Sequence, residues 1–196
     1  MESGTKPTTN EVSTDLMPQY HRAHIPGGTY FFTVVTFNRQ PLFKEESAVL
    51  WLKQCLEAEV ERHPFTIRAM VVLPDHLHTI WTLPEDDSDY SMRWRQIKSN
   101  FSRHYDRSTN GDVPESRRRK QEQDIWQRRF WEHAIKDQED FNRHCDYIHF
   151  NPVKHGLVKS AAGWKASTFQ RFVELGVYES DWGGRPDRTL LAMDCE

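Results

Sequence analysis

Residues 65–83 read Phe-Thr-Ile-Arg-Ala-Met-Val-Val-Leu-Pro-Asp-His-Leu-His-Thr-Ile-Trp-Thr-Leu, and they give the clearest indication of a β-sheet in the chain. Two apolar runs rich in β-branched and aromatic residues flank Pro74-Asp75, a pair typical of tight turns. The sequence therefore predicts a β-hairpin with strands at 65–73 and 76–83.

The second strand of this hairpin carries two histidines separated by one residue. Successive side chains of a strand point to opposite faces, so His76 and His78 share a face and Leu77 points to the other. Two neutral imidazoles on one face can bind the same divalent cation. The alternative is a pair of surface or hydrogen-bonded histidines without a ligand, since a chance His-x-His spacing is common in a chain with ten histidines.

Further signals surround the hairpin. The sequence predicts strands at 29–37 and 126–135 and helices at 45–62, from about 89 to 105, and at 137–151, where Pro152 forbids continuation. The order β-α-β-β-α-β-α is typical of the ferredoxin-like split βαβ fold, an α+β architecture with a central antiparallel sheet and helices on one face. We expect one domain at 18–176, tails at 1–17 and 177–196, and an exposed loop at 107–123.

Composition excludes several classes of protein. No apolar run approaches the roughly 18 residues of a membrane span, so no membrane partner is expected. The polar N-terminus does not resemble a secretory signal. Three cysteines without CxxC spacing argue against a disulfide framework or a thiolate zinc site. We therefore expect a cytoplasmic protein.

Positive charge is concentrated in one segment. The chain has a formal net charge of −3, yet residues 91–136 hold twelve Lys or Arg against six Asp or Glu. Such a segment is typical of a polyanion contact, and the alternative is a solvated helix face with ion pairs.

A second chemical motif lies in the last predicted helix. Tyr147 and Asn151 are spaced i, i+4 and so share one helical face. A phenol becomes a useful nucleophile when a divalent metal activates a phosphodiester, and Asn151 can add an oxygen ligand to the two imidazoles. That ligand set suits Mg²⁺ or Mn²⁺, whereas a third imidazole from His149 or His155 would favour zinc. The alternatives are a core aromatic for Tyr147 and a helix cap for Asn151.

Five motifs in the same order resemble the REP-associated tyrosine transposases, members of the single-tyrosine His-hydrophobic-His superfamily. The resemblance covers roughly residues 20–172. It rests on residues 26–33 with 39–43, on 72–78, on 93–98, on 126–133 and on 147–158.

The resemblance implies a metal-dependent enzyme acting on single-stranded DNA. It implies that His76, His78 and Asn151 bind Mg²⁺ or Mn²⁺ and that Tyr147 is the nucleophile that forms a 5′-phosphotyrosine. The implied activity is cleavage and rejoining of DNA near short hairpins, the repeated extragenic palindromes, by a bacterial, nucleoid-associated monomer or homodimer. Two alternatives are a non-catalytic hairpin-binding protein and a metal-dependent phosphoesterase that uses water.

With such a substrate, the basic segment gains a role. Exposed cations there are expected to neutralise DNA phosphates. The candidate DNA-binding residues are Arg93, Arg95, Lys98, Arg103, Arg117, Arg118, Arg119, Lys120, Arg128 and Arg129. Trp94 or Trp126 could stack on an unpaired base, although packing in the core is the preferred interpretation of both.

Overall fold

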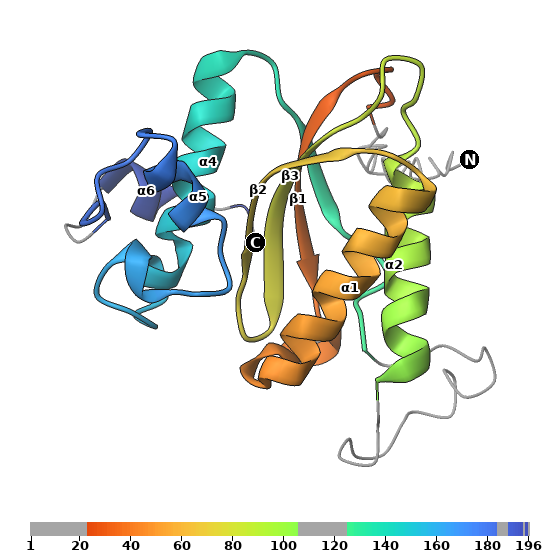
Figure 1. Ribbon diagram of the computed structural model, residues 1–196, viewed down its shortest axis with the longest axis horizontal. Helices are drawn as coiled ribbons and strands as arrows, with labels where there is room; N and C mark the ends of the chain where they lie inside the picture. Colours follow the sequence, from red (N-terminus) through yellow and green to blue (C-terminus); the bar gives the residue numbers. More distant parts are fainter. Residues whose placement is uncertain (1–22, 106–124, 184–187, 194, 196) are drawn as a thin grey trace, which may run out of the picture.

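A four-stranded antiparallel sheet forms the centre of the molecule, which we describe from a computed structural model covering residues 23–105, 125–183, 188–193 and 195. The sheet has the order β2-β3-β1-β4 (Figure 1). Its strands are β1 (Thr29–Val35), β2 (Thr66–Val72), β3 (His76–Thr82) and β4 (Trp131–Ala134). Because β1 and β2 both run antiparallel to β3, they are parallel to each other with β3 inserted between them. This is the predicted split βαβ arrangement, and the α+β fold is confirmed.

The predicted hairpin forms around Pro74-Asp75, with the Leu73 amide donating to the His76 carbonyl at 2.8 Å. The last strand is shorter than the predicted 126–135. Trp126 makes only an isolated bridge to Thr36 before the chain reaches β4.

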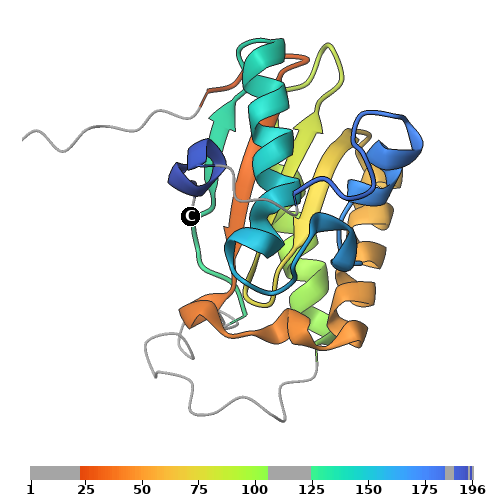
Figure 2. The same cartoon turned by 90° about the vertical axis from the view of Figure 1, so that its left-hand side faces the viewer.

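The helices cover both faces of the sheet. Helices α1 (Glu46–Arg62) and α2 (Tyr90–His104) pack on one face, and α4 (Gln138–Lys154) lies across the other (Figures 1 and 2). The predicted placement of all helices on one face is therefore wrong for α4. The physical reason is that the central strands are buried on both sides, with Phe31 and Ile80 on the face opposite Phe32 and Trp81, so each face needs a covering layer.

Two hydrophobic clusters result from the alternation of side chains along β1. Tyr30 and Phe32 point into the cluster with α1 and α2, where Trp81 and Trp94 stack with ring centroids 4.2 Å apart. Phe31 points to the opposite side, into the cluster beneath α4. Successive side chains of β1 thus point alternately into the cluster beneath α1 and α2 and into the cluster beneath α4.

Helix α2 begins where predicted, because the Asp89 side chain accepts a hydrogen bond from the Met92 amide at 2.8 Å. Helix α4, by contrast, continues past its predicted end to Lys154 and contains Pro152. Pro152 stands in the last turn, where its missing N–H removes one helical hydrogen bond without interrupting a longer ladder. The His155 amide still donates to the Asn151 carbonyl at 3.0 Å.

Short elements complete the chain. These are the 3₁₀ turns η1 (Phe37–Arg39), η2 (Leu42–Lys44) and η3 (Ala161–Gly163), and the helices α5 (Phe169–Glu174) and α6 (Arg188–Ala192). Tyr178 donates a hydrogen bond to Asp146 at 2.7 Å and stacks on Trp182. Part of the predicted tail at 177–196 therefore packs on the domain. The predicted tail at 1–17 and loop at 107–123 lie outside the described residues. Among the described helices, none is long and apolar enough to cross a membrane.

Replacing Trp94 by Ala is expected to lower the free energy of unfolding by about 3–5 kcal/mol, because it removes a buried ring and leaves a cavity. Urea denaturation followed by circular dichroism measures this change. Leu175, which is 69 % exposed, provides the control: Leu175→Ala should change stability by no more than about 0.5 kcal/mol. Equal effects of the two substitutions would contradict the assignment of Trp94 to the core.

Candidate active site

Strand β3 presents both histidines of the His-x-His pair on the face covered by α4. His76 and His78 are 1 % and 0 % exposed, and their ring centroids lie 4.9 Å apart. His78 pairs across the sheet with Thr33 and His76 with Val35. The strand thus holds two imidazoles side by side in a buried setting.

Hydrogen bonds at the Nδ1 atoms determine how each ring is oriented. His76 Nδ1 lies 2.6 Å from a carboxylate oxygen of Asp75. An ionised carboxylate can only accept a hydrogen bond, so the imidazole nitrogen is the donor. His78 Nδ1 lies 2.9 Å from the Thr33 hydroxyl, whose own proton is donated to the Cys195 carbonyl at 2.5 Å. Both imidazoles therefore carry their proton on Nδ1, which leaves a lone pair on Nε2.

The two Nε2 atoms are buried without a hydrogen-bond partner. Burial holds the pKa of His78 well below its usual range, and the neighbouring His76, His155, Lys154 and Arg39 lower it further. Burial alone would raise the pKa of Asp75, but its hydrogen bonds with His76 and Arg39 and the positive charge of Arg39 bring it below the usual value. A neutral imidazole oriented by a carboxylate or hydroxyl is the form in which histidine binds metals.

Helix α4 covers this pair with three residues spaced one turn apart. The ring of Tyr147 lies 5.2 Å from that of His78, and the ring of His155 lies 5.4 Å from that of His76. Asn151 stands between them in the i, i+4, i+8 series, so its side chain is directed at the pair. It is 0 % exposed, and neither its amide oxygen nor its amide nitrogen has a hydrogen-bond partner.

These atoms fit a divalent cation. Two imidazole nitrogens and an amide oxygen are ligand atoms, and leaving them buried without partners costs free energy. His155 is exposed and near His76, so it is the third imidazole within reach. His149 is not, because its Nε2 lies 2.9 Å from the Thr168 hydroxyl on the other side of the helix.

One cation lies beside the Tyr147 phenol. Lys154 Nζ is 3.5 Å from Tyr147 Oη and 4.9 Å from the centroid of its ring. The same ammonium donates to the Met193 carbonyl at 2.8 Å. The Lys154 ammonium thus lies between the Tyr147 phenol and the C-terminal segment.

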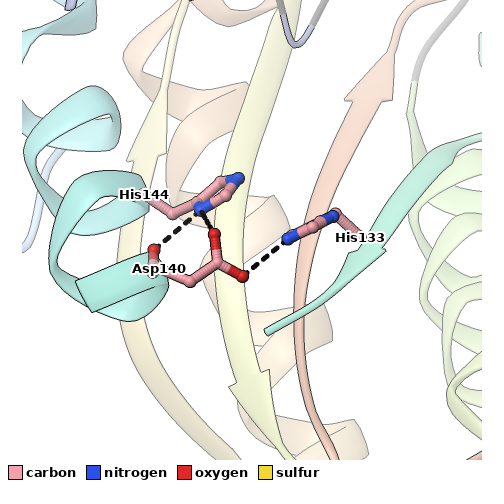
Figure 3. Close-up of side chains that lie close together, drawn as sticks. All are labelled: His133, Asp140 and His144. Atoms are coloured by element: carbon pink, nitrogen blue, oxygen red, sulfur yellow. Dashed lines mark hydrogen bonds and ion pairs between the residues drawn. The ribbon is translucent and has the colours of Figure 1, made fainter. Parts of the chain in front are cut away.

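A second group of potential ligands lies further toward the start of α4. His133 on β4 and Asp140 and His144 on α4 each offer one ligand atom, all within 4.8 Å of one another (Figure 3). This geometry is compatible with a metal ion. It is also a complete hydrogen-bonded network, since Asp140 accepts from His133 Nε2 at 2.8 Å, from the Lys136 amide and from Arg143.

The predicted DNA-binding residues are not equivalent. Arg95 and Arg103 are exposed on α2, and Arg128 and Arg129 are exposed just before β4. Arg93 instead is 1 % exposed and donates to the carbonyls of His63, Pro64 and Asp89, and it pairs with Asp87 at 2.6 Å. The prediction of a DNA contact there is wrong, because Arg93 is a buried link between α2 and the preceding loops.

The structure also assigns structural contacts to the remaining candidates for DNA binding that lie in the described residues. Lys98 donates a hydrogen bond to the Gln127 carbonyl at 2.8 Å, and its ammonium lies over the rings of Trp126 and Phe130. These contacts join α2 to the segment before β4. Trp94 and Trp126 are 1 % and 6 % exposed, which excludes stacking on a base and confirms the core interpretation. Residues 117–120 lie outside the described part of the chain.

Sequence reasoning missed Thr33, Asp75, Lys154 and the group around Asp140. Asp75 and Lys154 could have been found from the sequence, because each is a charged residue within a few positions of a candidate ligand. Asp140 and His144 are spaced i, i+4, but only the sheet register brings His133 to them. Thr33 has no local signal, since its role depends on the pairing of β1 with β3.

Comparisons with known proteins agree on one family. The model of the family described as "Transposase IS200 like" matches residues 25–151. The REP-associated tyrosine transposase of Escherichia coli K12 is 45 % identical over 86 % of this chain and 92 % of its own length. A putative REP-associated tyrosine transposase of Haemophilus influenzae is 39 % identical over 87 % and 96 %. The solved structure of the REP-associated tyrosine transposase bound to a REP hairpin is 44 % identical, with a TM-score of 0.70, over 86 % of this chain and 93 % of that one.

The network around Asp140 generates a prediction on stability and pH. Burial favours a raised pKa for this carboxyl, but the hydrogen bonds from His133, the Lys136 amide and Arg143 hold it far below its usual range. A lowered folded-state pKa stabilises the protein above the unfolded-state value, and this contribution is lost as pH falls below about 4. Asp140→Asn should therefore cost about 3 kcal/mol near pH 7 and progressively less in acid.

Urea denaturation of both proteins across that pH range measures the difference. The control is Asp86→Asn at an exposed carboxylate, which should leave stability within about 0.5 kcal/mol at every pH. A pH-independent loss for Asp140→Asn would show that its charge does not contribute.

Proposed function

This chain belongs to the family of IS200-like transposases, and from that premise we propose that it cleaves and rejoins single-stranded DNA beside short palindromic hairpins, using Tyr147 as the nucleophile. The family makes it an enzyme acting on DNA. One observation supports the finer mechanism above all others: the partnerless Nε2 atoms of His76 and His78 and the partnerless amide of Asn151 are buried next to a tyrosine.

We assign the divalent cation to His76, His78 and Asn151. When bound, Mg²⁺ or Mn²⁺ would withdraw charge from a phosphodiester oxygen. The protein's own contribution is to orient its ligands: Asp75 and Thr33 accept hydrogen bonds from the Nδ1–H groups and so leave the Nε2 lone pairs available for the cation. Asn151 stands on the same rigid helix as Tyr147, so ligand and nucleophile keep their relative positions.

Tyr147 then attacks the phosphorus of the scissile phosphodiester. The new bond joins its phenolic oxygen to phosphorus, and the bond to the 3′ oxygen breaks, so the phenol loses a proton and the leaving 3′ oxygen gains one. The result is a 5′-phosphotyrosine that conserves the energy of the phosphodiester. Attack by another 3′ hydroxyl reverses the step, releases the tyrosine and rejoins DNA. Lys154 supports the phenolate during both steps.

The hairpin substrate is supported by the relatives and by charge. A relative of 44 % identity was solved with a REP hairpin bound. In this chain, Arg95, Arg103, Arg128 and Arg129 are exposed cations of the kind that contact phosphates. The segment before β4 contacts α2, because Lys98 on α2 donates a hydrogen bond to the Gln127 carbonyl, so the two groups of cations stand on neighbouring elements.

Tyr147→Phe should abolish a covalent adduct that resists SDS, because phenylalanine has no attacking oxygen. The measurement is gel electrophoresis after incubation of the protein with Mn²⁺ and a labelled hairpin oligonucleotide that carries single-stranded flanks. The matched control is Tyr105→Phe, which removes a phenol from the opposite layer and should leave the adduct unchanged.

Three other results would each refute part of this proposal. An adduct formed by Tyr147→Phe would exclude this nucleophile. Hairpin binding without any adduct in the wild type would favour a non-catalytic binding protein. Hydrolysis that needs both histidines but not Tyr147 would favour a phosphoesterase that uses water.

Asn151→Ala should weaken binding of Mn²⁺ by at least about tenfold, a loss typical even of partners that only orient metal ligands. Thermal unfolding with increasing Mn²⁺ measures this directly, since a ligand bound only by the folded state raises the transition temperature. Hairpin affinity measured in EDTA should remain near that of the wild type. An unchanged Mn²⁺ shift would remove Asn151 from the ligand set.

A further inference from the structure

Trp131 differs from every other tryptophan of the chain in its exposure. All seven tryptophans lie within the described residues, and Trp131, at 41 %, is the only one classed as exposed. It stands at the start of β4, one of the two edge strands of the sheet. A large apolar ring left in solvent beside a candidate active site calls for an explanation by function or by packing.

The register of the sheet shows which face Trp131 occupies. Trp131 pairs with Thr33, and Thr33 pairs with His78, so the three residues form one row across β4, β1 and β3. Residues that pair across a sheet share a face. Trp131 is thus on the face of the candidate metal ligands, two strand spacings, or about 10 Å, from His78.

Contacts between rings confirm this placement and hold the indole in position. Its ring meets Phe31 edge-on, with centroids 5.7 Å apart, and lies parallel to the His133 ring at 6.1 Å. Phe31 in turn contacts Tyr147 at 6.0 Å, and His133 stacks on His144 at 4.7 Å. The inner side of the indole is therefore fixed by aromatic neighbours while the rest of the ring remains exposed.

The surroundings are suited to a nucleic acid strand. Arg128 and Arg129 are exposed and precede Trp131 by three and two residues, so they bring positive charge to the start of β4. An exposed aromatic ring together with cations that follow a backbone is the combination by which proteins bind unpaired bases. A duplex would not offer the face of a base to the ring, whereas a single-stranded flank does.

We propose that Trp131 is a stacking platform for one unpaired base in the single-stranded segment next to the scissile phosphate. This inference rests on the proposed function, because it places that segment along the row from His78 to the sheet edge. The ring would position the strand over the metal ligands and Tyr147 without taking part in the chemistry. The ligand is a nucleobase, and stacking on it does not depend on its hydrogen-bonding edge.

The test is a scan with abasic nucleotides. Fluorescein-labelled DNA hairpins carry single-stranded flanks in which one nucleotide at a time lacks its base, and their affinities are measured by anisotropy in EDTA. For the wild type, one flank position should lose about 5- to 150-fold in affinity when its base is removed, which corresponds to the usual range for one stacked base. For Trp131→Ala, the intact oligonucleotide should already bind that much more weakly, and the same abasic position should cause no further loss.

Two matched variants complete the experiment. Trp131→Phe keeps an aromatic ring and should retain most of the sensitivity at that position, while Leu157→Ala removes another exposed apolar side chain and should behave as the wild type. Thermal unfolding verifies that each variant is folded. All of these measurements are made without a divalent cation and therefore without cleavage.

The inference is overturned if Trp131→Ala binds the intact flanked hairpin as well as the wild type does. It is also overturned if the variant loses the same factor for every abasic oligonucleotide and for a hairpin without flanks, which would indicate a contact with the stem. Binding in EDTA does not depend on adduct formation. If Trp131→Ala removes the sensitivity to the abasic position but the wild type forms no adduct, only the proposed chemistry is refuted. If the wild type forms adducts but Trp131→Ala keeps the sensitivity to the abasic position, only the stacking role is refuted.

Discussion

The alternation of side chains along β1 and β3 is the constraint on which the rest of the structure depends. Both strands are buried on both faces, so every residue must suit one of two different layers. Along β3, Leu77 and Trp81 face α1 and α2, whereas the two histidines and Ile80 face α4. A slip of one residue in the pairing of β3 would turn both histidines toward α1 and α2 and bring Leu77 to the site. Correct strand register is therefore a condition of chemistry as well as of stability.

Much of this arrangement was predictable, because its signals are local. The hairpin around Pro74, the order of helices and strands and the single face shared by His76 and His78 follow from patterns spanning a few residues. The covering of the second face by α4 was missed, since continuous apolar strands indicate burial without saying which helix provides it. The end of α4 was misjudged because the rule against proline in helices is weakest in a last turn.

The sequence names the four side chains that the fold brings together at the candidate site, but not the residues that support them. Two histidines, a tyrosine and an asparagine can be recognised by residue type and spacing. Thr33 is related to His78 only through the pairing of distant strands. Charge was the least reliable guide. Arg93 lies in the most basic segment, yet its guanidinium is used to join a helix to its neighbouring loops. A count of cations cannot distinguish a buried structural arginine from one that faces a ligand.

The two hydrophobic clusters on either side of the sheet have a consequence for how this protein can change. The cluster containing Trp81 and Trp94 is separated from the candidate site by the full thickness of the sheet. Substitutions that repack it with equal volume alter stability while leaving the ligands and the nucleophile where they are. Stabilising substitutions on that side give the chain a reserve of stability, and this reserve allows costlier substitutions around the candidate site.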